Sequence, residues 1–432
     1  MAHSRHELRN DAAPQPHLLW VSQPASRAAS PADIGSMLRA GHGLVLISLT
    51  LLAFGVVMVT SAGLTVGQDR AVVLQDVLLG RTTQLAALAM VFMFIGSRLP
   101  VDRTLYRPMG IRSPMPWLVL GMIGLLVLVH VPGVGKEVNG AQRWIHIGAV
   151  GFQPSEVAKW GMVIALAWFA ARRAPVMHQF FAGFVPPMML TLVVCALIAS
   201  EDLGTAVLIG AVSVCLLVAA GCKWWHAAMW MPIGALGFIA AVLTSSYRMN
   251  RVKAFFDPYQ DPQGIGYHIL QSMGAISGGG FAGRGLGNSI QKFGYLPEDT
   301  TDFIFAIICE EMGVVGAAVV ISLYACLLWC GFSIVRRVEH PFQRLLGLGI
   351  LLAVGLQAFI NIAVVTGSAP TKGIALPLLS SGGTGWVLTA FCVGLVISMD
   401  RELAKKDTMF AKRREQMAQE AEAIVVANVP AA

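Results

Sequence analysis

Charged residues are scarce in this sequence. Of its 432 residues, 13% are Asp, Glu, Lys or Arg and 56% are apolar, and the mean hydropathy is +0.66. Because soluble domains carry about 25% charged residues, this composition excludes an ordinary soluble protein. It predicts a polytopic membrane protein.

Paired cysteines, nucleotide-binding spacings and repeats are also missing. The seven cysteines lie in or beside apolar runs and form no CxxC pair, which argues against a disulfide framework or a thiolate metal site. Gly278, Gly280 and Gly283 match GxGxxG, but they follow no strand of a βαβ unit, so we discount a dinucleotide site. We expect these glycines to let the backbone turn tightly or approach a ligand. No 20- to 50-residue repeat and no inverted pair of broken helices, typical of transporters, is visible.

Ten apolar segments are long enough for membrane helices, which need about 20 residues each. They lie near residues 43–63, 82–99, 116–133, 154–172, 181–199, 203–221, 224–246, 303–334, 345–367 and 383–400. The sequence therefore predicts an all-α polytopic membrane domain of about ten transmembrane helices over residues 43–400. The eighth segment is long and carries Gly313 and Gly316 in its middle, so we expect it to tilt or to begin above the membrane.

Lysine and arginine predict the orientation. They collect in the loops that share a side with both termini, so we expect both termini in the cytoplasm and the protein in the plasma membrane. The net charge of +7 is then mainly topogenic and attracts anionic lipid, with no nucleic-acid partner implied. Residues 1–42 lack the apolar core of a signal peptide and are expected to form a disordered cytoplasmic tail. Residues 401–432 are expected to form a cytoplasmic C-terminal tail, either a juxtamembrane helix or a disordered segment.

Two segments on the opposite, extracytoplasmic side are too long to be turns. One covers 134–153, and the other is a large loop at 247–302 between the seventh and eighth spans. Functional residues concentrate in such loops. The larger loop holds Arg248, Arg251 and Lys253 beside aromatic residues, a cluster that suits an interfacial helix or a phosphate contact.

Several ionisable residues are expected at membrane depth, where they are costly and often functional. Glu156 and Lys159 stand three apart and share a helix face. This spacing predicts a structural ion pair that locks two helices, and Lys159 could in addition present its charge to an anionic substrate. Glu310 and Glu311 point about 100° apart on a helix, so we expect one to be structural and the other to line a polar cavity.

Asp302 is the last polar residue before the eighth apolar segment. One interpretation is helix N-capping, for which Asp is a favoured residue. The other is a general base at the water–lipid boundary, which could reach a substrate hydroxyl while the lipid tail of that substrate stays in the bilayer. The residues alone leave both interpretations open.

Long motifs in order along the chain resemble those of a known family. They are NGAQRWIHIG at 139–148, QPSEVAK at 153–159, EDLGTA at 201–206, RVKAFFDPYQDPQGIGYHILQS at 251–272, GRGLGNSIQKFGYLPEDTTDFIFAIICEEMG at 283–313 and PTKGIALPLLSSGG at 370–383. From about residue 45 to 400 the chain resembles the shape, elongation, division and sporulation proteins, the FtsW/RodA group of peptidoglycan polymerases. It looks more like the division member than the elongation member because of GLGNSIQKFGYLPE and PTKG.

The resemblance implies an activity, a partner and a set of site residues. The activity is polymerisation of lipid II, the undecaprenyl-diphosphate-linked disaccharide-pentapeptide, at the division septum. The partners are a class B penicillin-binding protein, an FtsI-like transpeptidase with a single span, and other division proteins. The essential aspartate of the family falls at Asp302, its fourth-span Glu and Lys at Glu156 and Lys159, and its outer-loop arginine at Arg143.

The sequence departs from the family pattern at three places. Thr300 stands where His is common, Ser381 replaces a frequent Tyr, and Ser200-Glu201 replaces a common Gln-Pro. None of these changes touches the expected base.

The implied reaction is an inverting transfer, because the donor linkage is α and the product linkage is β. It needs a base, assigned to Asp302, and cations that stabilise the departing diphosphate. The candidates for the cations are Arg143, Lys159, Arg251 and Lys372. Mg²⁺ or another divalent cation would suit the diphosphate, although the sequence shows no protein cage for a metal. Two alternatives remain: a transporter that flips lipid II, and a non-catalytic scaffold of the division machinery.

Overall fold

The computed structural model describes most of the chain, namely residues 39–63, 79–107, 112–138, 141–147, 150–292, 296, 300–381 and 383–427. The expected disordered tail at 1–42 falls almost entirely outside the described residues.

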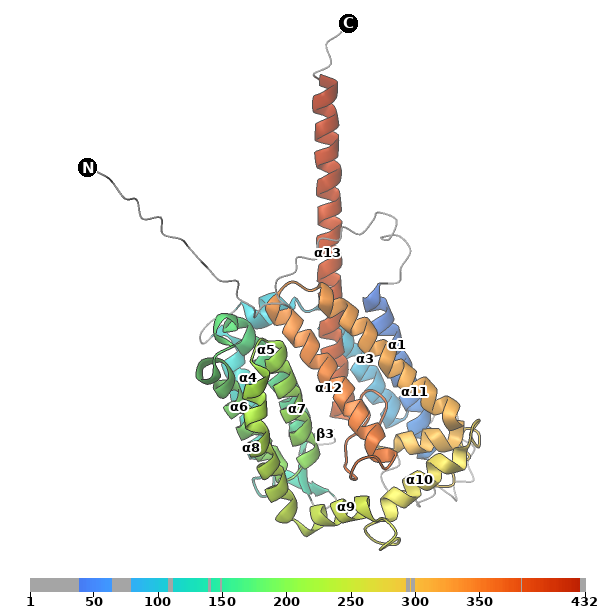
Figure 1. Cartoon of the computed structure of the whole chain (residues 1–432). Helices are drawn as coiled ribbons and strands as arrows, with labels where there is room; N and C mark the ends of the chain where they lie inside the picture. The colour runs from blue at the N-terminus through green and yellow to red at the C-terminus, as the bar shows by residue number, and fades with distance from the viewer. Residues whose placement is uncertain are drawn as a thin grey trace, which may run out of the picture. The chain divides into compact units, whose positions relative to one another are not determined.

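Ten long helices occupy the ten predicted apolar segments of the described chain (Figure 1). They are α1 (Ala40–Ala62), α3 (Arg81–Arg98), α4 (Pro114–Leu128), α5 (Pro154–Arg172), α6 (Val185–Ala199), α7 (Leu203–Ala219), α8 (Trp224–Leu243), α11 (Ile304–Arg337), α12 (Pro341–Val365) and α13 (Thr384–Ala427). Among the described residues, five helical segments are long and apolar enough to cross a membrane: α1, Phe180–Ala199 with α6, α8, α11 and α12. The helices α4 and α7 are apolar but shorter. The predicted all-α membrane architecture is confirmed.

The helices α12 and α13 organise the bundle. The helix α12 packs against α5, α7 and α11, and α13 packs along α3. The α3–α13 approach is close because glycines lie at the crossing: a Cβ on Gly96 would lie 2.4 Å from the backbone oxygen of Phe391, and one on Gly394 would lie 2.3 Å from that of Met93. Small residues at such crossings let membrane helices gain van der Waals contact.

The segment at 134–153 forms a small sheet that the sequence reading missed. Strands β1 (Gly135–Val138), β2 (Ala141–Ile147) and β3 (Val150–Phe152) pair antiparallel in the order β1-β2-β3. The register places Ile145 opposite Phe152 and Lys136 opposite Trp144. The Asn139-Gly140 pair between β1 and β2 is a hairpin signal that could have predicted this sheet.

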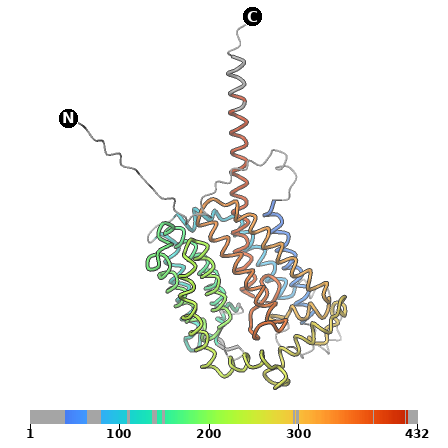
Figure 2. The backbone as a smooth tube through the Cα atoms, viewed as in Figure 1, coloured from blue at the N-terminus to red at the C-terminus, as the bar shows by residue number. Residues whose placement is uncertain are grey.

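The loop expected at 247–302 contains two helices, α9 (Ser246–Phe256) and α10 (Tyr267–Gly279). Figure 2 shows that α9, α10 and the 368–381 segment between α12 and α13 gather at one end of the bundle, opposite the far end of α13. We call this end the loop face. The predicted basic cluster of Arg248, Arg251 and Lys253 therefore lies on α9, a short helix of the loop face.

The backbone of residues 280–285 inserts into a break in α11. The break lies at Gly313, which has φ 65° and ψ −158°, a conformation essentially limited to glycine. Four backbone hydrogen bonds fill it: Arg284 N to Glu310 O (3.0 Å), Gly285 N to Glu311 O (2.9 Å), Val314 N to Gly280 O (3.1 Å) and Val315 N to Phe281 O (3.4 Å). Non-helical backbone at membrane depth is tolerated when protein satisfies its polar groups in this way. Glycine is required at position 283 for this close approach, because a Cβ on Gly283 would lie 2.2 Å from the backbone oxygen of Glu311. The expected approach to a ligand stays a prediction.

The helix α13 continues well beyond the apolar segment predicted at 383–400. It runs to Ala427, so the described part of the C-terminal tail is helical, one of the two expected states. Arg337 pairs with Asp407 at 2.9 Å, and Gln343 donates to Glu402 at 2.7 Å. These contacts fasten the first turns of the extension to the α11–α12 connection.

Candidate active site

The 368–381 segment is an irregular loop whose backbone groups bind a side chain of α11 and a side chain of the loop itself. Tyr324 donates its hydroxyl to the backbone oxygen of Pro377 at 2.6 Å, and the backbone N–H of Leu376 donates to Ser380 Oγ at 2.8 Å. Leu378 has a φ of 64°, an unfavourable value for a residue with a branched side chain. Strained loops of this kind concentrate at functional sites.

Asp302 lies against this loop, in the turn before α11. Its side chain is half-buried, and its Oδ2 lies 2.7 Å from the point where a Cβ on Gly373 would stand. Its backbone oxygen accepts a hydrogen bond of 2.7 Å from Nδ2 of Asn361. The helix itself begins at Ile304 with Phe303 as N-cap, and no side-chain cap bond is made from that position. The N-cap position therefore belongs to Phe303 and not to Asp302.

Lys372, next to Gly373, belongs to a group of cations at the loop face. Burial lowers the pKa of Lys372 from its ordinary 10.5 to about 8; the carboxylate of Asp202 acts against this shift, while Arg248, Arg251 and Arg143 add to it. We call Arg143, Arg248, Arg251 and Lys372 the cationic cluster. Arg143 on β2 and Arg251 on α9, both predicted to bind substrate, thus lie near enough to Lys372 to act on its charge. Lys372, predicted in the same set, lies on the loop that also contacts Asp302.

The arginines of the cationic cluster differ in how they are held. Arg251 donates from Nη1 to the backbone oxygen of Thr371 at 3.1 Å, which ties α9 to the Lys372 loop. Arg248 donates to the backbone oxygens of Ala199 and Ala241 at 2.6 and 3.0 Å. It joins the ends of α6 and α8.

Arg143 is carried by β2, and its Nε is buried without a hydrogen-bond partner among the described residues. Its strand is held in place by Glu201, whose Oε2 accepts from the backbone N–H of Gln142 at 2.7 Å. A buried donor that the protein leaves unpaired is a natural contact for an anionic ligand. The arrangement could therefore take a proton at Asp302 while nearby cations neutralise a leaving anion.

Glu156 and Lys159 form an ion pair in the protein interior. Lys159 Nζ lies 2.9 and 2.8 Å from the two carboxylate oxygens of Glu156 and 2.7 Å from Oε1 of Gln357. Its side chain is only 2% exposed. These contacts match the three donors of an ammonium group and tie α5 to α12. Substrate binding by this pair stays a prediction.

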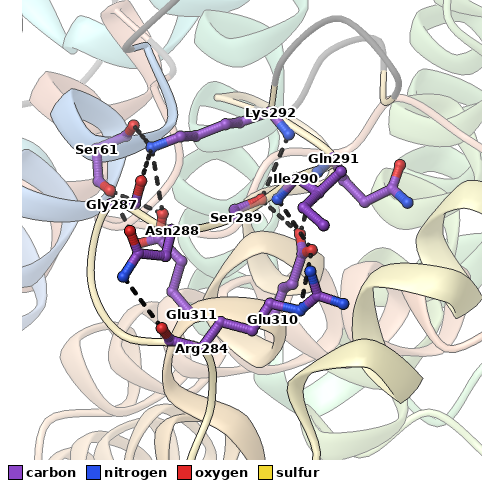
Figure 3. A network of polar contacts seen from close by, with 10 residues as sticks. All are labelled: Ser61, Arg284, Gly287, Asn288, Ser289, Ile290, Gln291, Lys292, Glu310 and Glu311. Atoms are coloured by element: carbon purple, nitrogen blue, oxygen red, sulfur yellow. Dashed lines mark hydrogen bonds and ion pairs between the residues drawn. The ribbon is translucent and has the colours of Figure 1, made fainter.

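Glu310 and Glu311 lie in a second buried polar network, drawn in Figure 3. Their partners are distinct: Glu310 accepts from Ser289 Oγ and from the backbone N–H groups of Ile290 and Gln291, whereas Glu311 accepts from Ser61 Oγ at 2.9 and 2.8 Å and lies 3.7 Å from Lys292 Nζ. The expectation that they could not share one partner is confirmed. The expectation that one would line a polar cavity is wrong, because both are at most 2% exposed and bound by protein groups. The network joins α1, the 280–292 segment and α11.

The sequence reading missed two amide side chains that reach the site. Gln357 and Asn361 stand four residues apart on α12, and both donate to backbone oxygens of the 368–381 loop. Their signal was present, since uncharged polar residues inside an apolar span are also costly unless bonded.

The chain matches a family of known proteins over most of its length. The model of the FtsW/RodA/SpoVE cell cycle proteins covers residues 42–405. The chain is 37% identical to a probable peptidoglycan glycosyltransferase FtsW of Geobacter sp. (strain M18) over 361 residues, 83% of this chain and 96% of that protein. It is 40% identical to the protein of the same name from Thioalkalivibrio sulfidiphilus (strain HL-EbGR7), over 84% of this chain and 90% of that protein.

Solved structures show the same fold. A chain from a peptidoglycan synthase complex that coordinates polymerization and crosslinking aligns with a TM-score of 0.67 at 29% identity, covering 83% of this chain and 97% of that chain. The rod shape determining protein RodA of Thermus thermophilus aligns with a TM-score of 0.58 at 26% identity, covering 83% of this chain and 96% of that chain. Sequence and fold agree, and the chain belongs to the FtsW/RodA/SpoVE family of cell cycle proteins.

Proposed function

We propose that this protein is a peptidoglycan glycosyltransferase that polymerises lipid II into glycan strands during cell division. The observation that carries the proposal is the contact between the Asp302 carboxylate and Gly373, because the neighbouring Lys372 belongs to the cationic cluster. We infer that this base and these cations act on one substrate. The names of the relatives support the same activity.

The reaction is a single displacement with inversion. The 4-hydroxyl oxygen of the acceptor sugar attacks C1 of the donor sugar, and the bond from C1 to the diphosphate oxygen breaks with its electron pair. Asp302 accepts the hydroxyl proton, and the cationic cluster stabilises the charge of the departing diphosphate. Arg143 and Lys372 are the members that we assign to the diphosphate, and Arg251 holds the Lys372 loop as well as adding charge.

In this proposal a divalent cation such as Mg²⁺ would be bound to the diphosphate of the substrate and not to a site made by the protein. Among the described residues, no group of three or more His, Cys, Asp or Glu side chains could hold a metal ion. The donor set does not fit a resident metal, and the reaction as proposed takes no step through one.

The location and the partner follow from the same proposal. We place the protein in the plasma membrane at the division septum, with both termini in the cytoplasm, and with a single-span class B penicillin-binding protein as partner. Support for a partner comes from the synthase complex to which the similar chain belongs. A groove of about 570 Å³ between α1 and α11, lined by residues that include Val315, Ala318 and Ser322, suits the membrane helix of that partner, since small residues promote helix packing in bilayers. Ala318→Trp should reduce co-purification of the partner, and unchanged co-purification would remove the groove from the proposal.

Polymerisation by purified protein, with lipid II as the only substrate, tests the activity. Wild type should form glycan polymer, alone or with the partner, and Asp302→Ala and Asp302→Asn should form none. The Asn variant keeps the shape and loses the basicity. Asp261→Asn is the matched control, because Asp261 is an exposed aspartate whose carboxylate, in the described part of the chain, binds local backbone N–H groups of Gly264 and Ile265.

Three outcomes would contradict the proposal. Polymer formation by Asp302→Asn would exclude Asp302 as the base. Movement of lipid II across vesicles without polymer would favour the transporter alternative. Normal division of cells that depend on Asp302→Ala would favour the scaffold alternative.

A further inference from the structure

Two buried amide side chains on α12 donate hydrogen bonds to the loop that carries Lys372. Gln357 and Asn361 are 6% and 1% exposed, and residues four apart lie on one face of a helix. Gln357 Nε2 donates to the backbone oxygen of Ala375 at 2.8 Å, and Asn361 Nδ2 donates to that of Ile374 at 2.6 Å. Two consecutive carbonyl groups of the loop are thus held by one helix.

Asn361 also holds the turn that carries Asp302. Its Nδ2 donates at 2.7 Å to the backbone oxygen of Asp302, so both amide hydrogens bind carbonyl groups from different segments. Its Oδ1 is buried and has no hydrogen-bond partner among the described residues. An unpaired buried acceptor is unfavourable for folding, which indicates that Asn361 is present for its two donors. Asn361 therefore fixes the Asp302 turn relative to the loop one residue beyond Gly373.

Gln357 joins the same contacts to the buried ion pair. Its Oε1 accepts from Lys159 Nζ at 2.7 Å, and Lys159 is bound by both oxygens of Glu156. A continuous path of hydrogen bonds leads from Glu156 through Lys159 and Gln357 to the loop. Asn361 continues it from the loop to Asp302.

We propose that Asn361 and Gln357 are positioning residues, which set the Asp302 carboxylate against the Lys372 loop, and that the Glu156–Lys159 pair acts on the reaction through Gln357. This inference rests on the proposed function and changes the role of Lys159 from a contact with substrate to a support of the site. A displacement of about 1 Å of a reacting group can reduce the rate about 100-fold. Loss of the Asn361 contacts should therefore appear in kcat.

The first test compares two amides of α12. Asn361→Ala should reduce kcat for lipid II polymerisation about 10- to 100-fold with little change in KM. Gln343→Ala is the matched control: Gln343 is a buried glutamine of the same helix, but it binds Glu402 of α13, and its loss should leave kcat near the wild-type value. Asn361→Ser keeps one donor and should give an intermediate loss, and it replaces Asn361→Ala if that variant does not fold. An unchanged kcat, or a loss confined to KM, would overturn the inference.

The second test asks how Lys159 acts. The pair-neutral variant Glu156→Gln/Lys159→Met removes both charges, and Gln357→Met removes the next contact. If the ion pair acts through Gln357, the combined variant should lose no more kcat than the more impaired parent, because the two changes break one path. If Lys159 meets the substrate, the pair-neutral variant should raise KM and add its effect to that of Gln357→Met.

A third measurement separates this inference from the proposed function. In wild-type protein and in Asn361→Ala, amide hydrogen exchange reports the stability of residues 300–304 and 370–381 without any substrate. Both segments should exchange faster in the variant and not in Gln343→Ala, and equal exchange would overturn the positioning role. Failure of wild type to polymerise lipid II would refute the proposed function and leave this exchange result to decide the coupling.

Discussion

The carboxylate of Asp302 occupies the space that a side chain at position 373 would need. Its Oδ2 lies 2.7 Å from the position of a Cβ on Gly373, and the next nearest atoms beyond the adjacent residues 372 and 374 also belong to Asp302. The clash would involve the free end of a side chain and not the backbone. A larger residue at 373 would therefore displace the carboxylate and leave the fold intact.

Gly373→Ala should for this reason abolish most polymerisation without unfolding the protein. Activity on lipid II and the thermal unfolding midpoint of the purified variant measure the two effects separately. Gly385→Ala is the matched control, because a Cβ there would lie 3.5 Å from Glu156 Oε2, an ordinary van der Waals distance. Full activity of Gly373→Ala would mean that the position of the carboxylate is not critical for the reaction.

Lys372 should make the activity fall as the pH rises through about 8. Burial lowers its pKa from 10.5 to about 8, so the ammonium that stabilises the diphosphate is lost above that pH. The free energy of unfolding, in contrast, should rise with pH over the same range. The unfolded chain binds this proton more tightly, so the destabilising effect of the buried charge is full below pH 8 and is relieved between pH 8 and 10.5.

The measurement is the pH profile of kcat/KM for lipid II between pH 6 and 10. Lys372→Arg keeps a positive charge at every pH in this range and should move the alkaline fall to higher pH. An identical profile for the two proteins would show that another group limits the reaction.

Much of the fold could be predicted from the sequence, because uninterrupted apolar runs of span length have few alternatives in a bilayer. The site was partly predictable. Asp302, Arg143, Arg251 and Lys372 carried charge in loops at the expected face, and the structure brings them around one loop.

The features of the site that could not be predicted are hydrogen bonds between residues that are far apart in the sequence. Two of the departures from the family pattern, Thr300 and Ser381, prove to be neighbours, since the Ser381 N–H donates to the backbone oxygen of Thr300 at 2.9 Å. The contacts of Asn361 with Asp302 and Ile374 are of the same kind. A single sequence shows that a polar residue stands in a span, but it does not show which carbonyl group that residue binds.

Lys159→Met should destabilise the protein strongly. Lys159 is 2% exposed and is bound to Glu156 and Gln357, and removal of one partner of a buried pair typically costs about 3–5 kcal/mol because the other charge is left unpaired. Thermal or denaturant unfolding in detergent checks this value. Glu156→Gln/Lys159→Met should recover most of the loss, since no buried charge remains. Equal stability of Lys159→Met and Glu156→Gln/Lys159→Met would show that the Glu156 carboxylate is hydrated once Lys159 is removed.

Gly313→Ala should separate the inserted 280–285 segment from α11. A Cβ at Gly313 would lie 2.5 Å from the backbone nitrogen of Gly283 and from the backbone oxygen of Phe281, and backbone atoms cannot turn aside as the end of a side chain can. The backbone of Gly313 also has a φ of 65° with a ψ of −158°, a region that costs a non-glycine residue about 1–3 kcal/mol. Clash and strain act together, so a loss of stability at the upper end of that range is expected.

The same substitution should free the groups that depend on the insertion. Glu310 and Glu311 bind Ser289 and Lys292 across it, so amide exchange in residues 280–292 should rise in Gly313→Ala along with the loss of stability. Gly121→Ala is the matched control, since Gly121 lies in the helix α4 and a Cβ there would meet no atom within 4 Å. In a helix interior alanine is favoured over glycine by about 1 kcal/mol, so this variant should be at least as stable as wild type. If Gly313→Ala unfolded at the wild-type temperature, as the control should, the inserted segment would not be needed for the stability of α11. The burial of Glu310 and Glu311 would then have to be stabilised by other contacts.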